Sequence, residues 1–168
     1  GTCNLDCPLC SRNNPAAKHL LVKNHRPVEE IIKTIEKFPN LKRICIAGII
    51  SEPTLYKAFK RLILYIGIRE LYTNASAHDK FWWSELGEVF PPNIKIYFTV
   101  CGSTQELHEK YRKGSNLNKL LDNAQSFKDT YKYKNDYIQH IKFNYNKEDF
   151  HTEAMQNIIK MFNNSFLI

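Results

Sequence analysis

Three cysteines within eight residues, close to the N-terminus, constrain this chain more than any other feature of its sequence. Cys3, Cys7 and Cys10 follow a C-x3-C-x2-C spacing in the segment CNLDCPLC. Thiolates are soft ligands that suit iron–sulfur clusters, zinc and copper(I), and this spacing lets one loop surround one metal centre. Three thiolates leave one iron of a four-iron cluster without a protein ligand, so that iron is open to a small molecule. The triplet therefore predicts a metal centre in this loop.

A structural zinc site and a disulfide are the alternatives for the triplet. Structural zinc takes four ligands, usually from a second pair of cysteines or histidines, and the chain has no second C-x2-C. Cys45 and Cys101 are single and distant in sequence. Five cysteines are an odd number, and three of them cluster, which favours a reducing compartment over a disulfide framework. This usage predicts a cytoplasmic protein.

Length and composition indicate one globular domain. The chain has 168 residues, 43% of them hydrophobic and 24% charged, which suffices for one domain with a real core. The longest apolar run, 62–68, is too short to cross a bilayer, and no signal peptide is visible, so we expect no membrane partner. The formal charge of +7 allows an anionic partner, but the lysines are dispersed along the chain. That dispersion predicts a solvated surface and argues against nucleic acid.

Strands and helices are predicted to alternate. The polar segment 11–26 is predicted to be a loop. Apolar stripes at helical spacing predict helices over about 27–38, 54–66, 78–89, 103–113, 117–127 and 146–162. Short apolar runs predict strands at 43–47, 68–73, 94–100 and 137–145, and the start of another at 166–168. This alternation predicts a parallel sheet with helical crossovers.

The same patterns predict which side chains face which way. The strand at 94–100 is expected to turn Ile94, Ile96, Phe98 and Val100 towards the helices and Tyr97 and Thr99 away from them. The strand at 137–145 is expected to present His140, Lys142 and Asn144 to a cavity as candidate substrate contacts. The helix at 78–89 is expected to bury Phe81, Trp82, Leu86 and Val89.

Four motifs occur in the order seen in the radical S-adenosylmethionine (radical SAM) superfamily. The segment 3–10 resembles the cluster loop of that family. The segment GIISEP at 48–53 resembles its glycine-rich G-G-E-P segment, and TNA at 73–75 resembles its T-N-G. The run HEKYR at 108–112 is similar to the H-x-x-Y-R of members with a peptide-modifying barrel. The resemblance covers nearly the whole chain, from residue 3 to about residue 145.

The resemblance implies an α/β fold of a particular kind. It is a partial (βα)6 TIM-like barrel, with a curved, open parallel sheet and helices on the outside. The family places the cluster loop directly after the first strand, and only Gly1 and Thr2 precede Cys3. We therefore expect residues 1–168 to be a single radical SAM core domain without its first strand, taken from a longer protein that extends at both ends.

The resemblance also implies the site. Cys3, Cys7 and Cys10 would hold a 4Fe–4S cluster whose open iron binds S-adenosylmethionine (SAM). Glu52 would hold the amino group of SAM and Arg112 its carboxylate, through guanidinium geometry, and both are expected to serve SAM rather than the fold. The residues expected to bind SAM are Gly48, Ser51, Glu52, Asn74, Thr99 and Arg112.

The activity implied is that of a radical SAM enzyme. One electron, from a donor such as flavodoxin or ferredoxin, would cleave a carbon–sulfur bond of SAM. The resulting 5′-deoxyadenosyl radical would abstract a hydrogen from a substrate, which could be a peptide, a protein or a small molecule. Ile50, Ser51 and Cys101 depart from the family pattern. These departures leave open a catalytically degenerate iron–sulfur relative, and a zinc-binding interaction module is the third hypothesis.

Overall fold

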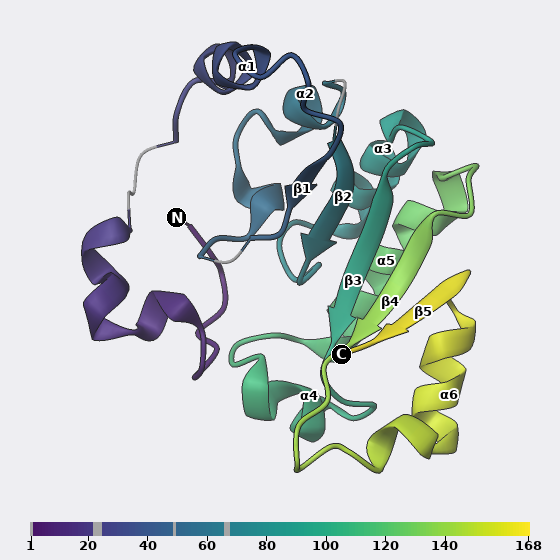
Figure 1. Cartoon of the computed structure of the whole chain (residues 1–168). Coiled ribbons are helices and arrows are strands. Elements are labelled where there is room, and N and C mark those ends of the chain that lie inside the picture. The colour runs from purple at the N-terminus through teal and green to yellow at the C-terminus, as the bar shows by residue number, and fades with distance from the viewer. Residues whose placement is uncertain (1, 22–24, 49, 66–67) are drawn as a thin grey trace.

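A parallel sheet forms the centre of the molecule (Figure 1). The computed structural model describes residues 2–21, 25–48, 50–65 and 68–168, without the side chains of Lys18 and Leu20. Within them the strands are β1 (Ile44–Ile46), β2 (Ile68–Thr73), β3 (Lys95–Val100), β4 (Asp136–His140) and β5 (Asn164–Leu167). They lie in the order of the sequence, and each neighbouring pair is parallel. The expected open parallel sheet is confirmed, with five strands among the described residues.

Helices connect the strands and cover the outer face of the sheet. They are α1 (Val28–Glu36), α2 (Phe59–Ile63), α3 (Lys80–Val89), α4 (Gln105–Tyr111), α5 (Leu117–Thr130) and α6 (Glu153–Lys160). Short 3-10 turns add η1 (Ser11–Asn13), η2 (Pro15–Leu20), η3 (Pro53–Leu55) and η4 (Asp149–His151). In Figure 1, α3 and α5 lie behind β3 and β4, and the N-terminal segment lies well away from both. The expectation of outer helices is thus confirmed.

The core lies between the sheet and α3 and α5. Phe98 of β3 is fully buried against Trp83 of α3 and Phe127 of α5, with ring centroids 5.7 Å apart in both pairs. On the opposite face, Tyr97 stacks on Tyr72 at 4.3 Å. The alternation expected along β3 is therefore confirmed, and each large side chain buried on the helix side contributes about 1.5–3 kcal/mol to folding.

The buried face of α3 differs from the expectation. Phe81 and Val89 are 69% and 44% exposed, whereas Trp83 is fully buried and donates its indole N–H to the carbonyl of Ala77 at 3.0 Å. Gly87 is also buried. A Cβ there would lie 2.4 Å from the carbonyl oxygen of Phe127, so the close approach of α5 requires a glycine at this position. Because Trp82 and Trp83 are adjacent, the sequence pattern does not decide which of them faces the core. The close approach of α5 at Gly87 turns Trp83 inward.

Strand β4 is shorter than expected, and its faces are reversed. It ends at His140, which is buried on the helix side with its ring 5.7 Å from that of Phe150. After Ile141 the chain turns, since Asn146 accepts from the N–H of Phe143 at 2.6 Å and donates to the carbonyl of Ile141 at 2.9 Å. His140, Lys142 and Asn144 are therefore not the cavity contacts that the alternation predicted.

Several helix boundaries differ from the predicted ranges. Thr104 caps α4 by accepting from the N–H of Leu107, and Thr152, six residues after the predicted start, caps α6. The expected loop at 11–26 contains η1 and η2, and the expected helix at 54–66 is divided into η3 and α2. The predicted end of that helix, residue 66, lies outside the described residues.

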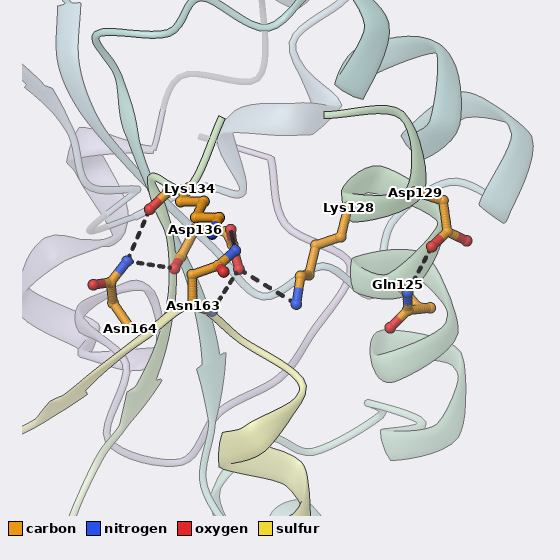
Figure 2. Close-up of polar contacts among 7 residues, drawn as sticks. All are labelled: Gln125, Lys128, Asp129, Lys134, Asp136, Asn163 and Asn164. Carbon is orange, nitrogen blue, oxygen red and sulfur yellow. Dashed lines mark hydrogen bonds and ion pairs between the residues drawn. The ribbon is translucent and has the colours of Figure 1, made fainter. Parts of the chain in front are cut away.

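Buried Asp136 anchors β5 beside β4 at the end of the sheet remote from the cysteines (Figure 2). Its carboxylate accepts from the N–H of Asn163 at 3.1 Å and lies 3.7 Å from the ammonium of Lys128. Asn164 donates to the carbonyl of Lys134 at 3.0 Å.

In the described part of the chain, no helix combines the length and the apolar character needed to span a lipid bilayer.

Candidate functional site

A cavity of about 530 Å³ opens at the carboxyl ends of the strands, the place where parallel sheets bind ligands. All nine residues that the sequence predicted to bind the cluster or SAM line it. They are Cys3, Cys7, Cys10, Gly48, Ser51, Glu52, Asn74, Thr99 and Arg112. These residues come from the N-terminal loop and from segments at the ends of β1, β2, β3 and α4, so the fold brings together positions more than 100 residues apart.

The cysteine loop is held by backbone hydrogen bonds and by short polar side chains. The N–H of Asp6 donates to the carbonyl of Lys113 at 3.0 Å, which ties the loop to the segment after α4. Asn13 donates to the carbonyl of Cys7 at 2.9 Å, and Arg12 donates to that of Cys3 at 3.2 Å. The loop backbone is therefore fixed on two sides before any metal binds.

The three cysteine side chains of the loop line the cavity together, and thiolates are the ligands that iron–sulfur clusters take. Zinc requires its donors about 2.0–2.3 Å from one point, whereas in a 4Fe–4S cluster each thiolate binds a different iron. Three cysteine side chains of one loop on the wall of a cavity fit the second arrangement.

Arg112 lies beside the cysteines. Burial raises the pKa of the Cys7 thiol, and the positive charge of Arg112 opposes that rise. Burial also raises the pKa of Cys101, and Arg112 again opposes it through charge and a hydrogen bond. The Nε of Arg112 is buried without a hydrogen-bond partner among the described residues. This donor therefore remains for a group that enters the cavity.

Glu52 serves the fold, which corrects the expectation that it does not. One carboxylate oxygen accepts from the N–H and hydroxyl of Thr54 at 3.2 and 2.8 Å and from the hydroxyl of Thr73 at 2.7 Å. The other accepts from the N–H of Asn74 at 2.9 Å. The side chain thus joins the start of η3 to the end of β2. Among the described residues, the first oxygen thus accepts three hydrogen bonds and the second accepts one.

The glycine and the loop after β2 have strained or crowded backbones. Gly48 has φ +55°, and a Cβ there would lie 2.4 Å from the carbonyl oxygen of Ser51, so the turn requires glycine. Ala75 has φ +49°, a conformation that costs a non-glycine residue about 1–3 kcal/mol. Asn123 stabilises it by donating to its carbonyl at 2.8 Å. The backbone therefore adopts the turn expected for T-N-G although the glycine is absent.

Sequence inspection missed several cavity residues. Gln139 and Ile141 line the cavity instead of the predicted neighbours on β4, and Cys45 lines it from β1. Gln139 is paired in register with Thr99 and accepts from its hydroxyl at 2.8 Å. Strand alternation could have predicted these residues, because Cys45 and Gln139 lie on the strand face that lines the cavity and Ile141 follows two residues after Gln139. Which residues of β4 lie on that face depends on where the strand ends, and the sequence did not show that end.

His108 of the H-x-x-Y-R run is fully buried next to the site. Its Nδ1 accepts from the N–H of Cys101 at 3.1 Å, so Nε2 carries the proton of the neutral ring. Burial, followed by the charge of Arg112, lowers its pKa to about 4, with Glu109 opposing and His140 adding to the effect. The histidine is therefore uncharged at neutral pH.

This buried histidine predicts a pH dependence of stability. In the unfolded chain it gains a proton below pH 6.5, whereas in the folded chain it stays neutral until about pH 4. The free energy of unfolding is thus expected to fall by ~2 kcal/mol between pH 7.5 and pH 5 from this group alone. Urea unfolding at both pH values should show a loss of stability that is ~2 kcal/mol larger in the wild type than in His108→Asn, whose amide oxygen takes the place of the Nδ1 acceptor. An equal pH dependence in both proteins would contradict the assignment.

Comparison with known proteins places the fold. No family model matches the chain, and no curated protein does. Among solved structures, SuiB of Streptococcus suis bound to its precursor peptide SuiA superposes with a TM-score of 0.72 at 18% identity. The match covers 99% of this chain and 36% of that one. SuiB bound to S-adenosylmethionine matches over 94% of this chain and 34% of that one, with a TM-score of 0.65 at 17% identity.

A second enzyme has the same architecture. The structure of anSMEcpe with bound AdoMet matches with a TM-score of 0.67 at 20% identity, over 98% of this chain and 47% of that one. Both neighbours are radical SAM enzymes, so the chain has the radical SAM fold that its motifs predicted. It spans between about a third and a half of the length of these structures.

Proposed function

We propose that this chain is the core domain of a radical SAM enzyme and that the cavity holds a 4Fe–4S cluster and SAM. One observation carries the proposal: the three cysteines and the six other residues of the sequence motifs line a single cavity. These nine positions come from five separate segments of the chain. The domain would be part of a longer protein, and the activity of that whole protein is part of the proposal.

The cluster, when bound, supplies the electron that cleaves SAM to methionine and a 5′-deoxyadenosyl radical, and flavodoxin or ferredoxin is the class of donor that would reduce it. The chain's own residues bind and orient. Cys3, Cys7 and Cys10 act as thiolate ligands. Glu52, which lines the cavity and whose second oxygen accepts a single hydrogen bond, accepts from the amino group of SAM, and the guanidinium of Arg112, whose Nε has no partner among the described residues, donates to its carboxylate.

A peptide is the substrate class that we propose. SuiB was crystallised with a precursor peptide and anSMEcpe with the Kp18Cys peptide, and the present chain has the fold of both. The inner face of the sheet carries an aromatic row that continues from the cavity, with Tyr97 between Tyr72 at 4.3 Å and Tyr137 at 4.8 Å. Such a row offers flat apolar surface and hydroxyl groups to an extended chain.

The direct test is anaerobic reconstitution with iron and sulfide, followed by reduction in the presence of SAM. We expect four irons per chain and release of 5′-deoxyadenosine. Arg112→Ala should retain its iron and bind SAM about 10- to 100-fold more weakly, which corresponds to the loss of one charged hydrogen bond. Calorimetric titration of SAM measures this, with Arg43→Ala as control, since Arg43 pairs with Glu70 outside the cavity.

Two outcomes would overturn the proposed function, and a third would overturn the role of Arg112 in it. Iron and sulfide without any cleavage of SAM would identify a degenerate iron–sulfur relative, as the departures at Ser51 and Cys101 allow. Zinc without iron would identify an interaction module. Unchanged SAM affinity in Arg112→Ala would place the SAM carboxylate elsewhere in the cavity.

A further inference from the structure

A line of buried hydrogen bonds runs from α4 to the loop after β2. The N–H of Cys101 donates to Nδ1 of His108 at 3.1 Å, and Nε2 of His108 lies 3.0 Å from the hydroxyl of Ser115. That hydroxyl lies 2.7 Å from the hydroxyl of Ser76, which donates to the carbonyl of Asn74 at 3.2 Å. All five residues are buried. The line ends at the residue that contacts the cysteine loop.

The direction of every hydrogen in this line follows from its first bond. Because Nδ1 of His108 accepts from a backbone N–H, Nε2 must carry the proton and donate to Ser115. The Ser115 hydroxyl has then accepted once, and its own hydrogen points to Ser76. The hydrogen of Ser76 points to the carbonyl of Asn74. Each hydroxyl accepts once and donates once, an arrangement in which neighbouring bonds strengthen one another.

Two segments that this line joins hold the cysteine loop. The side-chain amide of Asn74 donates to the sulfur of Cys3 at 3.7 Å and to Oδ1 of Asn4 at 3.2 Å. Two residues before Ser115, the carbonyl of Lys113 accepts from the N–H of Asp6 at 3.0 Å. The Ser115 hydroxyl therefore joins the two segments, 74–76 and 113–115, that contact the loop from different sides.

We infer that Ser115 is a positioning residue of the cluster site. Its hydroxyl holds that of Ser76, and the N–H of Ser76 donates to Oδ1 of Asn74 at 2.8 Å, which keeps the amide of Asn74 directed at the sulfur of Cys3. The inference rests on the proposed function, since it assigns a role at the cluster. Hydrogen bonds to cysteine sulfur are one of the means by which proteins set the reduction potential of iron–sulfur clusters. An N–H donor favours the reduced, more negative state, so weakening it lowers the potential. Outer partners of metal ligands also govern how tightly the metal is held.

The test compares wild type, Ser115→Ala and Thr130→Val after the same anaerobic reconstitution. Thr130→Val is the control. The hydroxyl of Thr130 also makes hydrogen bonds, to the backbone carbonyls of Ser84 and Phe127, but it lies away from the cavity. We expect Ser115→Ala to assemble the cluster, to lose iron to a chelator about 10-fold faster, and to have a more negative midpoint potential in a titration followed by electron paramagnetic resonance. Thr130→Val should match the wild type in both measurements.

A purely structural role for Ser115 would reduce stability without moving the midpoint potential, so wild-type potential and iron release in Ser115→Ala overturn the inference. If that variant fails to fold, Ser76→Ala removes the next link and is judged by the same two measurements. A wild type without iron and sulfide overturns the proposed function itself, and the two failures are thereby distinguished. A change in Thr130→Val equal to that in Ser115→Ala would show that loss of any buried hydroxyl has this effect and would also overturn the inference.

Discussion

Cys7→Ala is expected to abolish the iron–sulfur cluster. Cys7 is the buried member of the triplet, and the charge of Arg112 opposes the rise in the pKa of its thiol that burial causes. Two remaining thiolates cannot hold a four-iron cluster against solvent and chelators, so iron and sulfide should fall from about four per chain to near zero. Iron and sulfide analysis after reconstitution, together with the loss of broad visible absorbance, measures the effect.

The matched control is Cys45→Ala. Cys45 lines the same cavity, but it lies on β1 outside the triplet. We expect this variant to keep its full iron content, because the resemblance assigns the cluster to the loop at 3–10. Full iron in Cys7→Ala, or equal loss in Cys45→Ala, would show that the ligands have been assigned wrongly.

Glu52→Ala is expected to destabilise the fold by about 3–5 kcal/mol. The substitution leaves two buried backbone N–H groups, of Thr54 and Asn74, and the hydroxyl of Thr73 without their acceptor. Each buried donor left unpaired costs about 1–3 kcal/mol, and the hydroxyls recover part of this by turning to other acceptors. A loss of this size is a large part of the ~5–15 kcal/mol that stabilises a domain. Urea unfolding of the two proteins measures it.

Two further variants separate this effect from the general loss of a carboxylate. Glu148→Ala removes a glutamate whose side chain is 83% exposed, and we expect its stability to stay within about 0.5 kcal/mol of the wild type. Glu52→Gln should fall between the others, because its amide oxygen still accepts from the two threonines while its NH2 group faces the N–H of Asn74. Wild-type stability in Glu52→Ala would mean that the carboxylate serves only a ligand.

The Glu52 result also bears on function. If Glu52 both joins η3 to β2 and binds the amino group of SAM, its removal affects folding and binding together. Arg112→Ala is therefore the sharper probe of SAM binding, since the Nε of Arg112 has no partner among the described residues. Loss of SAM affinity at full stability in Arg112→Ala would separate binding from folding, which Glu52 cannot do.

The sequence by itself determined the sheet and nine of the residues that line the cavity. Apolar runs alternating with helical stripes can only bury their surfaces as a parallel sheet with crossovers, and β2 and β3 were predicted within one residue of their observed bounds. In such a sheet the strand ends meet at one edge. Glu52, Asn74 and Thr99, each at or after a strand end, therefore had to approach one another, and the cysteine loop identified the edge.

Only the tertiary structure decided the orientation of several elements. The strand period of two means that a shift of one residue exchanges the faces, and the turn built by Asn146 ended β4 in the phase that points Gln139 into the cavity. On α3, the approach of α5 at Gly87 decided which tryptophan is buried. Both choices depend on contacts with segments that lie far away in the sequence.

The same holds for the polar groups around the site. Motif order suggested a ligand role for Glu52, but two of its four hydrogen bonds reach to Thr73 and Asn74, more than 20 residues along the chain. Ser115 and Ser76 are 39 residues apart and belong to no motif, and their hydroxyls meet only because α4 packs beside the loop after β2. Periodicity determines which face is apolar, whereas the partner of a buried polar group depends on the packed structure.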